Sequence, residues 1–315
     1  MLLTFSSLVI GTSSIETSLA WLAAPDAQSS VILWQIRLPR TVGAWLAGAL
    51  LGLAGAIAQG VFRNPLAEPY LLGTASGAAL GVTLSLIAAG ASIEGLGWMS
   101  KLGVTSAACL GAAVATLLTM SLARGVLQTQ SLLLSGVVVA FLLGAITQLL
   151  LLTRPDLWRT MQTFLFGSTG FVNWPGAALL GGVLCVCAVP AIFLSRGLDA
   201  LTLGEDTAQS LGLSLTTLRL TLLGVVALAT AAAVGQVGVV GFVGLVAPHL
   251  VRETLSLNHR QLLIAAPLCG GALLQAADLA SRGVMRPGEL PVGAVTACIG
   301  GVYLVFLLWR RSRRD

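Results

Sequence analysis

The chain has 315 residues, of which 56% are hydrophobic and only 9% are charged, and its mean hydropathy is +0.93. Because an ordinary soluble domain carries about 25% charged residues, this composition excludes a soluble globular protein. The net charge of +5 comes from 16 arginines and a single lysine, Lys101, and in a membrane protein such charges indicate topology signals before nucleic-acid binding.

The long apolar runs do not alternate polar and apolar residues as the strands of a membrane barrel do. In hydrocarbon every backbone polar group must be satisfied within its own segment, so these runs predict helices. We therefore expect an all-α polytopic membrane protein in which residues 1–315 form a single transmembrane domain in the lipid bilayer.

The first apolar run, residues 1–11, is followed by polar residues without a convincing cleavage site, so we expect no cleavable signal peptide. As a helix it would reach only about 16 Å, which is too short to cross a bilayer unaided. It is counted as a short first span.

Two longer runs follow, residues 41–61 and 69–93, on either side of a polar turn that two prolines bracket. In both runs small residues recur at every fourth position, a spacing that lets helix backbones approach closely in lipid. They are Gly48, Gly52, Ala56 and Gly60, then Gly73, Gly77 and Gly81. The spacing predicts close helix packing, although glycine and alanine are also simply common in membrane helices.

The other charge-free runs are residues 102–123, 125–153, 160–195, 220–251, 261–277 and 290–309. Two of them exceed one crossing. Gly, Asn and Pro interrupt the first half of 160–195, which predicts a short surface helix and then a span from about Pro175. Glycines between 235 and 244 favour a turn between two spans in 220–251. The predicted total is ten spans.

Ten spans place both termini on one side of the membrane. Ten basic residues then share the side of the C-terminus and seven lie on the other, so we expect the C-terminus in the cytoplasm. The longest polar stretch on that side, residues 195–219, reads as two short helices along the membrane surface. It is a candidate docking segment for a partner, or a plain amphipathic loop.

The sequence offers no catalytic site. It has no Gly-Lys dipeptide to end a phosphate-binding loop, so energy from ATP must arrive through another subunit. HExxH and GxSxG are absent, and His249 and His259 are assigned no catalysis. All five cysteines lie in apolar runs, so we expect no disulfide framework, no metal site and no cofactor. Asp278 and Glu68 are too few acids for a proton relay.

Five ordered motifs resemble the FecCD-type permease family of bacterial ABC importers for iron chelates, haem and cobalamin. The likeness runs from about Val31 to the C-terminus. The motifs are WQIRLPR (34–40), FRNPLAEPYLLG (62–73), LGEDTAQSLGL (203–213), GFVGLVAPHLVR (241–252) and ELPVGAVTACIG (289–300).

The resemblance implies the type II importer fold, with inverted repeats that relate helices two to five with seven to ten. It implies a permease homodimer in the bacterial inner membrane, two cytoplasmic ATPase subunits and an extracytoplasmic substrate-binding protein. No nucleic acid is expected as a partner. Family members usually begin with a full first helix, whereas here the polar GTSSIET follows only eleven residues, which indicates a truncated helix or a misplaced start.

The resemblance also assigns roles to residues at matching positions. Arg37, Arg40 and Arg282 match arginines that engage glutamates of the binding protein, although an arginine at a membrane edge also snorkels to lipid headgroups. Asn64, Leu66, Thr129 and Gln130 match positions of the cytoplasmic gates. Residues 203–213 match coupling helices, with Glu205, Gln209 and Leu211 as the candidate ATPase contacts.

The predicted function is therefore the permease subunit of an ATP-driven importer. Ferric siderophores and cobalamin are the favoured cargoes. Haem is less favoured, because the sequence has no cluster of His, Met or Tyr residues that would bind it. The alternative is an ion-coupled secondary transporter that works without ATPase subunits.

Overall fold

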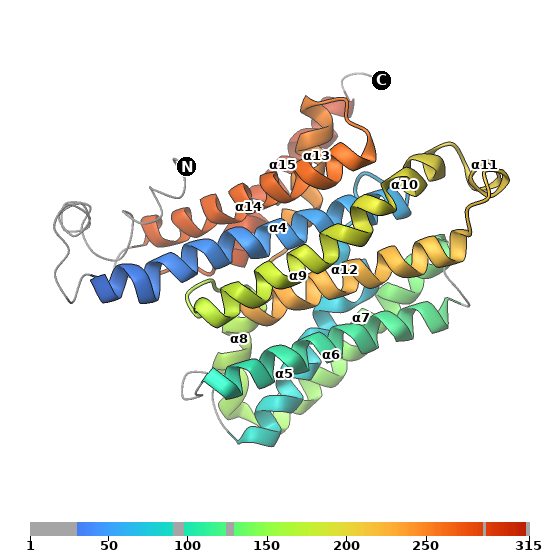
Figure 1. Ribbon diagram of the computed structural model, residues 1–315. Coiled ribbons are helices and arrows are strands. Elements are labelled where there is room, and N and C mark those ends of the chain that lie inside the picture. The colour runs from blue at the N-terminus through green and yellow to red at the C-terminus, as the bar shows by residue number, and fades with distance from the viewer. Residues whose placement is uncertain (1–29, 91–97, 124–128, 286–287, 313–315) are drawn as a thin grey trace.

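The computed structural model describes residues 30–90, 98–123, 129–285 and 288–312, and within these ranges it is helical without strands. Figure 1 shows the helices in one bundle. In chain order they are η1 (Ile32–Arg37), α4 (Leu38–Val61), η2 (Pro69–Leu72), α5 (Thr74–Ala89), α6 (Trp98–Leu122), α7 (Thr129–Thr153), η4 (Pro155–Leu157), α8 (Trp158–Phe166), α9 (Trp174–Phe193), α10 (Ser195–Thr202), α11 (Glu205–Ser210), α12 (Leu215–Val237), α13 (Val243–Thr254), α14 (His259–Val284) and α15 (Val292–Ser312).

Six stretches among the described residues are long and apolar enough to cross a membrane. They are Ile32–Val61, Gly103–Leu122, Gln130–Thr153, Trp174–Phe193, Leu215–Val237 and His259–Val284. Thr74–Ala89 and Val292–Leu307 are apolar but shorter. The predicted short first span lies outside the described residues.

The two long runs divide as the sequence predicts, with one difference. Run 160–195 forms α8 and then α9, which begins at Trp174, where the side chain of Asn173 accepts a hydrogen bond from the backbone of Gly176 at 2.9 Å. Run 220–251 breaks after Val237. However, α13 has only 12 residues, about 18 Å, so it is shorter than the other long helices of the bundle.

The predicted span over residues 69–93 is also shorter than expected. Pro69 opens η2, and Gly73 then adopts a left-handed backbone with φ of +74°, which ends that turn. Helix α5 starts only at Thr74 and has 16 residues. The chain therefore contains two breaks, residues 62–73 between α4 and α5 and residues 238–242 between α12 and α13, each followed by a short helix.

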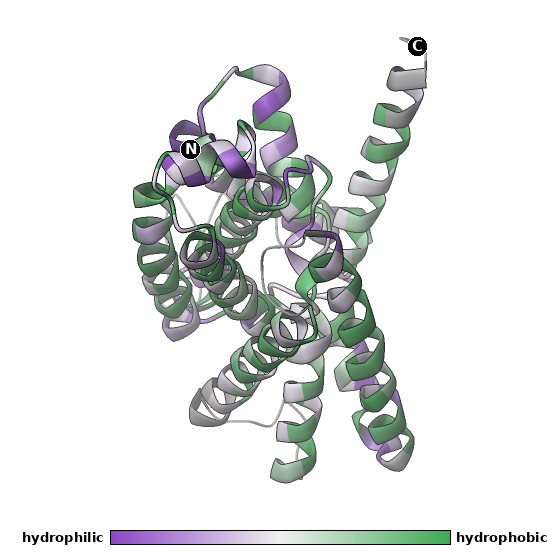
Figure 2. Cartoon of the chain, turned by 90° about the vertical axis from the view of Figure 1, so that its right-hand side faces the viewer, coloured by the Kyte–Doolittle hydropathy of each residue, from purple (hydrophilic) through white to green (hydrophobic). Residues whose placement is uncertain are grey.

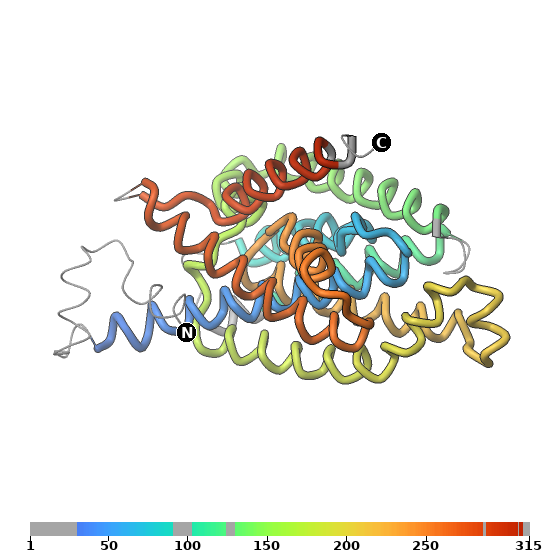
Figure 3. Tube along the Cα trace, turned by 90° about the horizontal axis from the view of Figure 1, so that it is seen from above, coloured from blue at the N-terminus to red at the C-terminus, as the bar shows by residue number. Residues whose placement is uncertain are grey.

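Helix α4 is the centre of the bundle. In its most apolar stretch of 18 residues, 83% of the residues are buried, against 28% for α7 and for α9. Figures 1 and 3 show α4 running along the long axis of the bundle beside α14, with α10 and α11 projecting at one end. Its apolar side chains therefore face protein, whereas much of α7 and α9 faces outward.

The glycine spacing is used for close helix contacts. A Cβ on Gly48 or Gly52 would overlap backbone carbonyls of Gly270 or Ala266 in α14, and a Cβ on Gly77 would overlap that of Gly111 in α6. Two backbones can lie this near only where no side chain separates them. The two sets of glycines thus face different partners, α4 against α14 and α5 against α6.

Large apolar side chains cover the outside of the bundle. Figure 2 shows hydrophobic residues dominating the helices when they are viewed from the end where α10 and α11 lie. On α7, the side chains of Phe141 and Leu152 are 77% and 75% exposed. Such a face is stable against lipid or another protein and not against water, which agrees with a membrane protein.

Candidate functional site

A network of charged side chains lies at the end of the bundle where α4 begins. The Arg40 guanidinium binds Asp278 Oδ1 at 2.9 Å and forms two parallel hydrogen bonds of 3.0 and 2.9 Å to Glu289. Arg282 Nη2 lies 2.6 Å from Asp278 Oδ2, and the Thr169 hydroxyl donates to Asp278 Oδ1. The network therefore joins α4, the segment after α8, α14 and the segment before α15.

Asp278 is the centre of this network, because its side chain is fully buried and both oxygens accept from arginines. Burying a charge is costly unless it is paired and hydrogen-bonded. The positive charges of Arg40 and Arg282 are balanced by the negative charges of Asp278 and Glu289. The three arginines predicted to dock a binding protein fall near this end, with Arg37 one turn before Arg40 on the same run of helix and 7% exposed.

A cavity of about 480 Å³ lies beside the network, and Arg40, Arg159, Gln162 and Glu289 are among the residues that line it. The amphipathic helix α8 forms one wall. Just before α8, Arg154 lies 2.9 Å from Asp156 of η4 in an exposed ion pair. The hydrogen bond from Arg154 lowers the pKa of the Asp156 carboxyl below its usual value.

The two breaks meet inside the bundle. The Glu68 carboxylate accepts a hydrogen bond from the backbone N–H of Phe242 at 2.9 Å, and the Tyr70 hydroxyl donates to the Val240 carbonyl at 3.1 Å. Next to them, Gln59 in the last turn of α4 donates to the Leu245 carbonyl of α13 at 3.1 Å. Side chains of the first break therefore satisfy backbone groups of the second.

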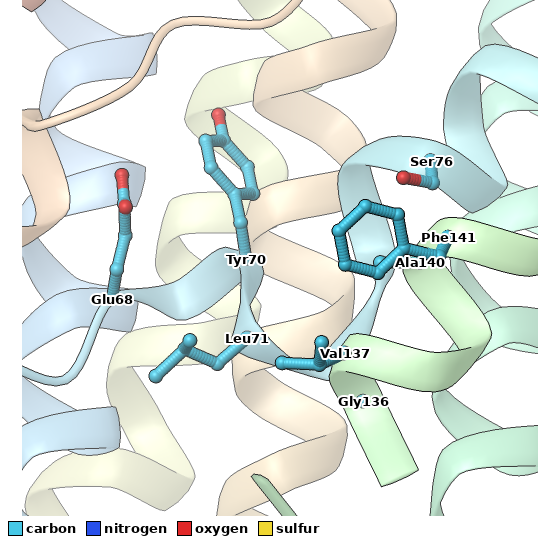
Figure 4. Close-up of a pocket in the computed structure, with 8 residues that line it drawn as sticks. All are labelled: Glu68, Tyr70, Leu71, Ser76, Gly136, Val137, Ala140 and Phe141. Atoms are coloured by element: carbon cyan, nitrogen blue, oxygen red, sulfur yellow. The ribbon is translucent and has the colours of Figure 1, made fainter. Parts of the chain in front are cut away.

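A second cavity, of about 360 Å³, lies beside the first break and is lined by Glu68, Tyr70, Leu71 and Ser76 together with residues of α7. Figure 4 shows Glu68 and Tyr70 side by side with their polar ends pointing the same way, and Phe141 of α7 near Ser76. The cavity thus combines one carboxylate and two hydroxyls with apolar walls.

The predicted gate residues lie near the end of the bundle that carries α10 and α11. The side chain of Asn64 accepts from the backbone N–H of Leu66 at 2.9 Å, which closes a tight turn, and Leu66 is 39% exposed. Gln130 is exposed in the first turn of α7. The side chain of Thr129 lies outside the described residues.

The short helices α10 and α11 project from this end. Glu205 at the start of α11 accepts a hydrogen bond of 2.8 Å from Arg63 and another of 2.8 Å from Arg219 of α12. Gln209 and Leu211 point outward, and Leu211 is 64% exposed. Of the three predicted coupling residues, Glu205 is held within the chain and the other two are open to a partner.

A family model described as the FecCD transport family matches residues 1–310 of the chain. The chain belongs to the FecCD transport family.

Curated relatives of this FecCD family member are named as ABC permeases. It is 35% identical to the uncharacterized ABC transporter permease YvrB of Bacillus subtilis, over 93% of this chain and 82% of the relative. Identity is also 35% to the iron(3+)-hydroxamate import permease FhuB of Bacillus subtilis, over 98% and 80%. For the vitamin B12 import permease BtuC of Salmonella schwarzengrund it is 35% over 93% and 89%.

A solved structure has the same fold. It is described as an inward-facing conformation of a metal-chelate type ABC transporter, and it matches with a TM-score of 0.85 at 28% identity. The match covers 98% of this chain and 96% of the other. The FecCD fold therefore extends through nearly all of the sequence.

Sequence reasoning about this FecCD family member noted Asp278 and Glu68 only as isolated acids. The pairing of Asp278 with Arg282 was visible as an i, i+4 spacing on a helix. The contacts of Glu68 with Phe242 and of Arg63 with Glu205 join residues more than 140 positions apart. No local pattern could have revealed them.

The histidines also have partners that the sequence did not suggest. His259 Nδ1 lies 2.7 Å from Asp199 of α10, and the backbone N–H of His259 donates to the same carboxylate at 3.0 Å. The His249 ring packs edge-on against Tyr303, with 5.8 Å between the ring centres. Within the described ranges, no three His, Cys, Asp or Glu side chains cluster closely enough to hold a metal ion.

Proposed function

We propose that this chain is the membrane-spanning permease subunit of an ATP-driven ABC importer that carries a metal chelate across the bacterial inner membrane. The observation that carries the proposal is its likeness to a metal-chelate type ABC transporter over 98% of its length. Ferric siderophores and cobalamin are the leading cargo, since relatives named for either are 35% identical. Haem is the weaker candidate.

The working unit is a homodimer of ten-span permeases with two cytoplasmic ATPase subunits and an extracytoplasmic substrate-binding protein. Two features support this arrangement. Each half of the chain has a long helix, a break and a short helix, α4 to α5 and α12 to α13, as an inverted repeat would. The segment 195–219 supplies two projecting helices, each followed by an exposed leucine, Leu203 after α10 and Leu211 after α11, which suits a docking element for the ATPase.

The remaining assignments follow from this orientation. Arg37, Arg40 and Arg282 form the outer docking edge, where a partner carboxylate would reach Arg40 by displacing the partly exposed Glu289. Asn64, Leu66, Thr129 and Gln130 form the inner gate. Helix α15 ends on the side of α10 and α11 (Figures 1 and 3), which supports a cytoplasmic C-terminus.

Co-purification of the permease with its ATPase subunits tests the proposal and separates it from the ion-coupled alternative. We expect the wild-type chain to bring down an ATPase, and Gln209→Trp in α11 to abolish this by placing an indole where the partner should pack. Gln162→Trp is the matched control, because Gln162 is an exposed glutamine on α8 at the other end.

Uptake in proteoliposomes completes the test. Transport of ferric siderophore or cobalamin that requires both ATP and the binding protein would support the proposal. Uptake that an ion gradient drives in the absence of any ATPase would overturn it, and so would a Gln209→Trp complex that assembles and transports as the wild type does.

A further inference from the structure

Two residues with left-handed backbone stand out in the described part of the chain. Arg63 with φ of +49° and Phe242 with φ of +68° are the non-glycine residues there with positive φ. A side chain makes this conformation unfavourable, so it persists where the surroundings hold it, often at functional positions. Arg63 lies in the first break and Phe242 in the second.

A glutamate holds each of these strained residues. Glu68 Oε1 accepts the backbone N–H of Phe242 at 2.9 Å, and Glu205 Oε1 accepts Arg63 Nη2 at 2.8 Å. The first contact fixes the backbone that enters α13. The second ties the first break to the projecting helix α11.

A short, hydrogen-bonded turn connects the two contacts. Asn64 N–H donates to the Gln59 carbonyl at 3.1 Å, and Ala67 N–H donates to the Asn64 carbonyl at 3.0 Å. Arg63 and Glu68 are therefore the two ends of one compact turn. A displacement of α11 that moves Arg63 would therefore also shift Glu68, and with it the hydrogen bond from Phe242.

The far end of this connection borders a cavity and another helix. Glu68 lines the cavity of about 360 Å³ beside α7 (Figure 4). The side chain of Phe242 packs against Gly300 of α15, where any Cβ would overlap it. Movement of the second break would thus reach α13, α15 and the cavity together.

We propose that Glu68 is a positioning residue which, through Arg63 and Glu205, links the placement of α11 to the break before α13. This proposal rests on the proposed function in one respect, because it assumes that the ATPase moves α11. It adds a physical connection between that element and the interior of the bundle.

Hydrogen–deuterium exchange of the purified permease in nanodiscs tests the connection without any partner. We expect Glu68→Ala to speed exchange of the Phe242 amide about tenfold, the effect of losing one hydrogen bond. Glu68→Gln keeps an acceptor oxygen and should stay within about twofold of the wild type. Unchanged exchange in Glu68→Ala would overturn the proposal.

Arg63→Gln tests the link from α11, because it leaves Glu205 paired with Arg219. We expect it to speed exchange of the Phe242 amide at least about threefold. Asp199→Asn is the matched control, since it removes a carboxylate of α10 that holds α14 instead. An effect of Arg63→Gln no larger than that of Asp199→Asn would overturn the link.

Transport provides a second readout in the assembled complex. Arg63→Gln should retain ATP hydrolysis but move less cargo per ATP, whereas a merely destabilised protein would lose both in proportion. Retained coupling in Arg63→Gln would count against the link. If no ATPase binds, the proposed function fails while the exchange result still decides whether the two breaks are connected.

Discussion

At the scale of single residues, the charge network around Asp278 is the clearest case of chemistry that burial dictates. Asp278 is fully buried on α14, and its charge is tolerated because Arg40 and Arg282 both donate to it. Glu289 then balances the second arginine. The same contacts mean that Arg40 and Arg282 are already engaged within the chain, so the docking proposed at this edge would have to compete with internal ion pairs.

Replacing Asp278 with Asn should destabilise the permease by about 3–5 kcal/mol, because it leaves two arginines around a neutral buried group. The thermal unfolding midpoint in detergent, followed by tryptophan fluorescence, measures this. Asp156→Asn removes a carboxylate from an exposed pair and should leave the midpoint where it is. Equal midpoints for both variants would mean that the network does not stabilise the fold.

At the scale of elements, the fold depends on backbones that touch. Gly48 and Gly52 of α4 face carbonyls of α14, which lets α4 lie deep in the bundle. The breaks after α4 and α12, residues 62–73 and 238–242, are different, because there the backbone is irregular and packs against other parts of the protein. Such backbone is tolerated at membrane depth only where protein or a water-filled path covers it.

Gly48→Ala should lower the unfolding midpoint by an amount equivalent to about 1–3 kcal/mol, the usual cost of overpacking. The added methyl group would collide with the Gly270 carbonyl and Leu274. Gly182→Ala in α9 makes the same change where nothing lies within 4 Å, and it should be neutral. A neutral Gly48→Ala would show that α4 and α14 can separate without cost.

At the scale of the whole molecule, the bundle has two chemically different ends. The end with the Asp278 network also carries α8 and the Arg154–Asp156 pair. The other end carries α10, α11 and the pairs of Glu205 with Arg63 and Arg219. Figures 1 and 3 show α10 and α11 at one end of the long axis, and the start of α4 with the end of α14 at the other.

Cysteine labelling in intact cells should separate these two ends. In a cysteine-free background, Asp156→Cys should react with a membrane-impermeant maleimide from outside, and Asp206→Cys only after the membrane is opened. Both positions are exposed and lie outside the long spans. Labelling of Asp206→Cys from outside would invert the proposed orientation and place the C-terminus outside as well.

The sequence by itself determined the helical membrane class, most of the spans and the places where they stop. Long apolar runs with few charges can cross hydrocarbon only as helices when they lack the alternation of barrel strands. Pro175 marks the start of α9, and the glycines near 238 mark the end of α12. It also pointed to the family through five motifs. These features are local, since each is written in consecutive residues.

Only the tertiary structure decided how far the two short helices extend and which side chains meet. Glu68 reaches Phe242 across 174 positions, and Arg40 reaches Asp278 across 238. A lone acid in an apolar sequence must find a donor, but the sequence does not say which. The packing of α4 against α12, α13 and α14 made that choice, because it brings groups that are distant in the sequence within hydrogen-bonding distance.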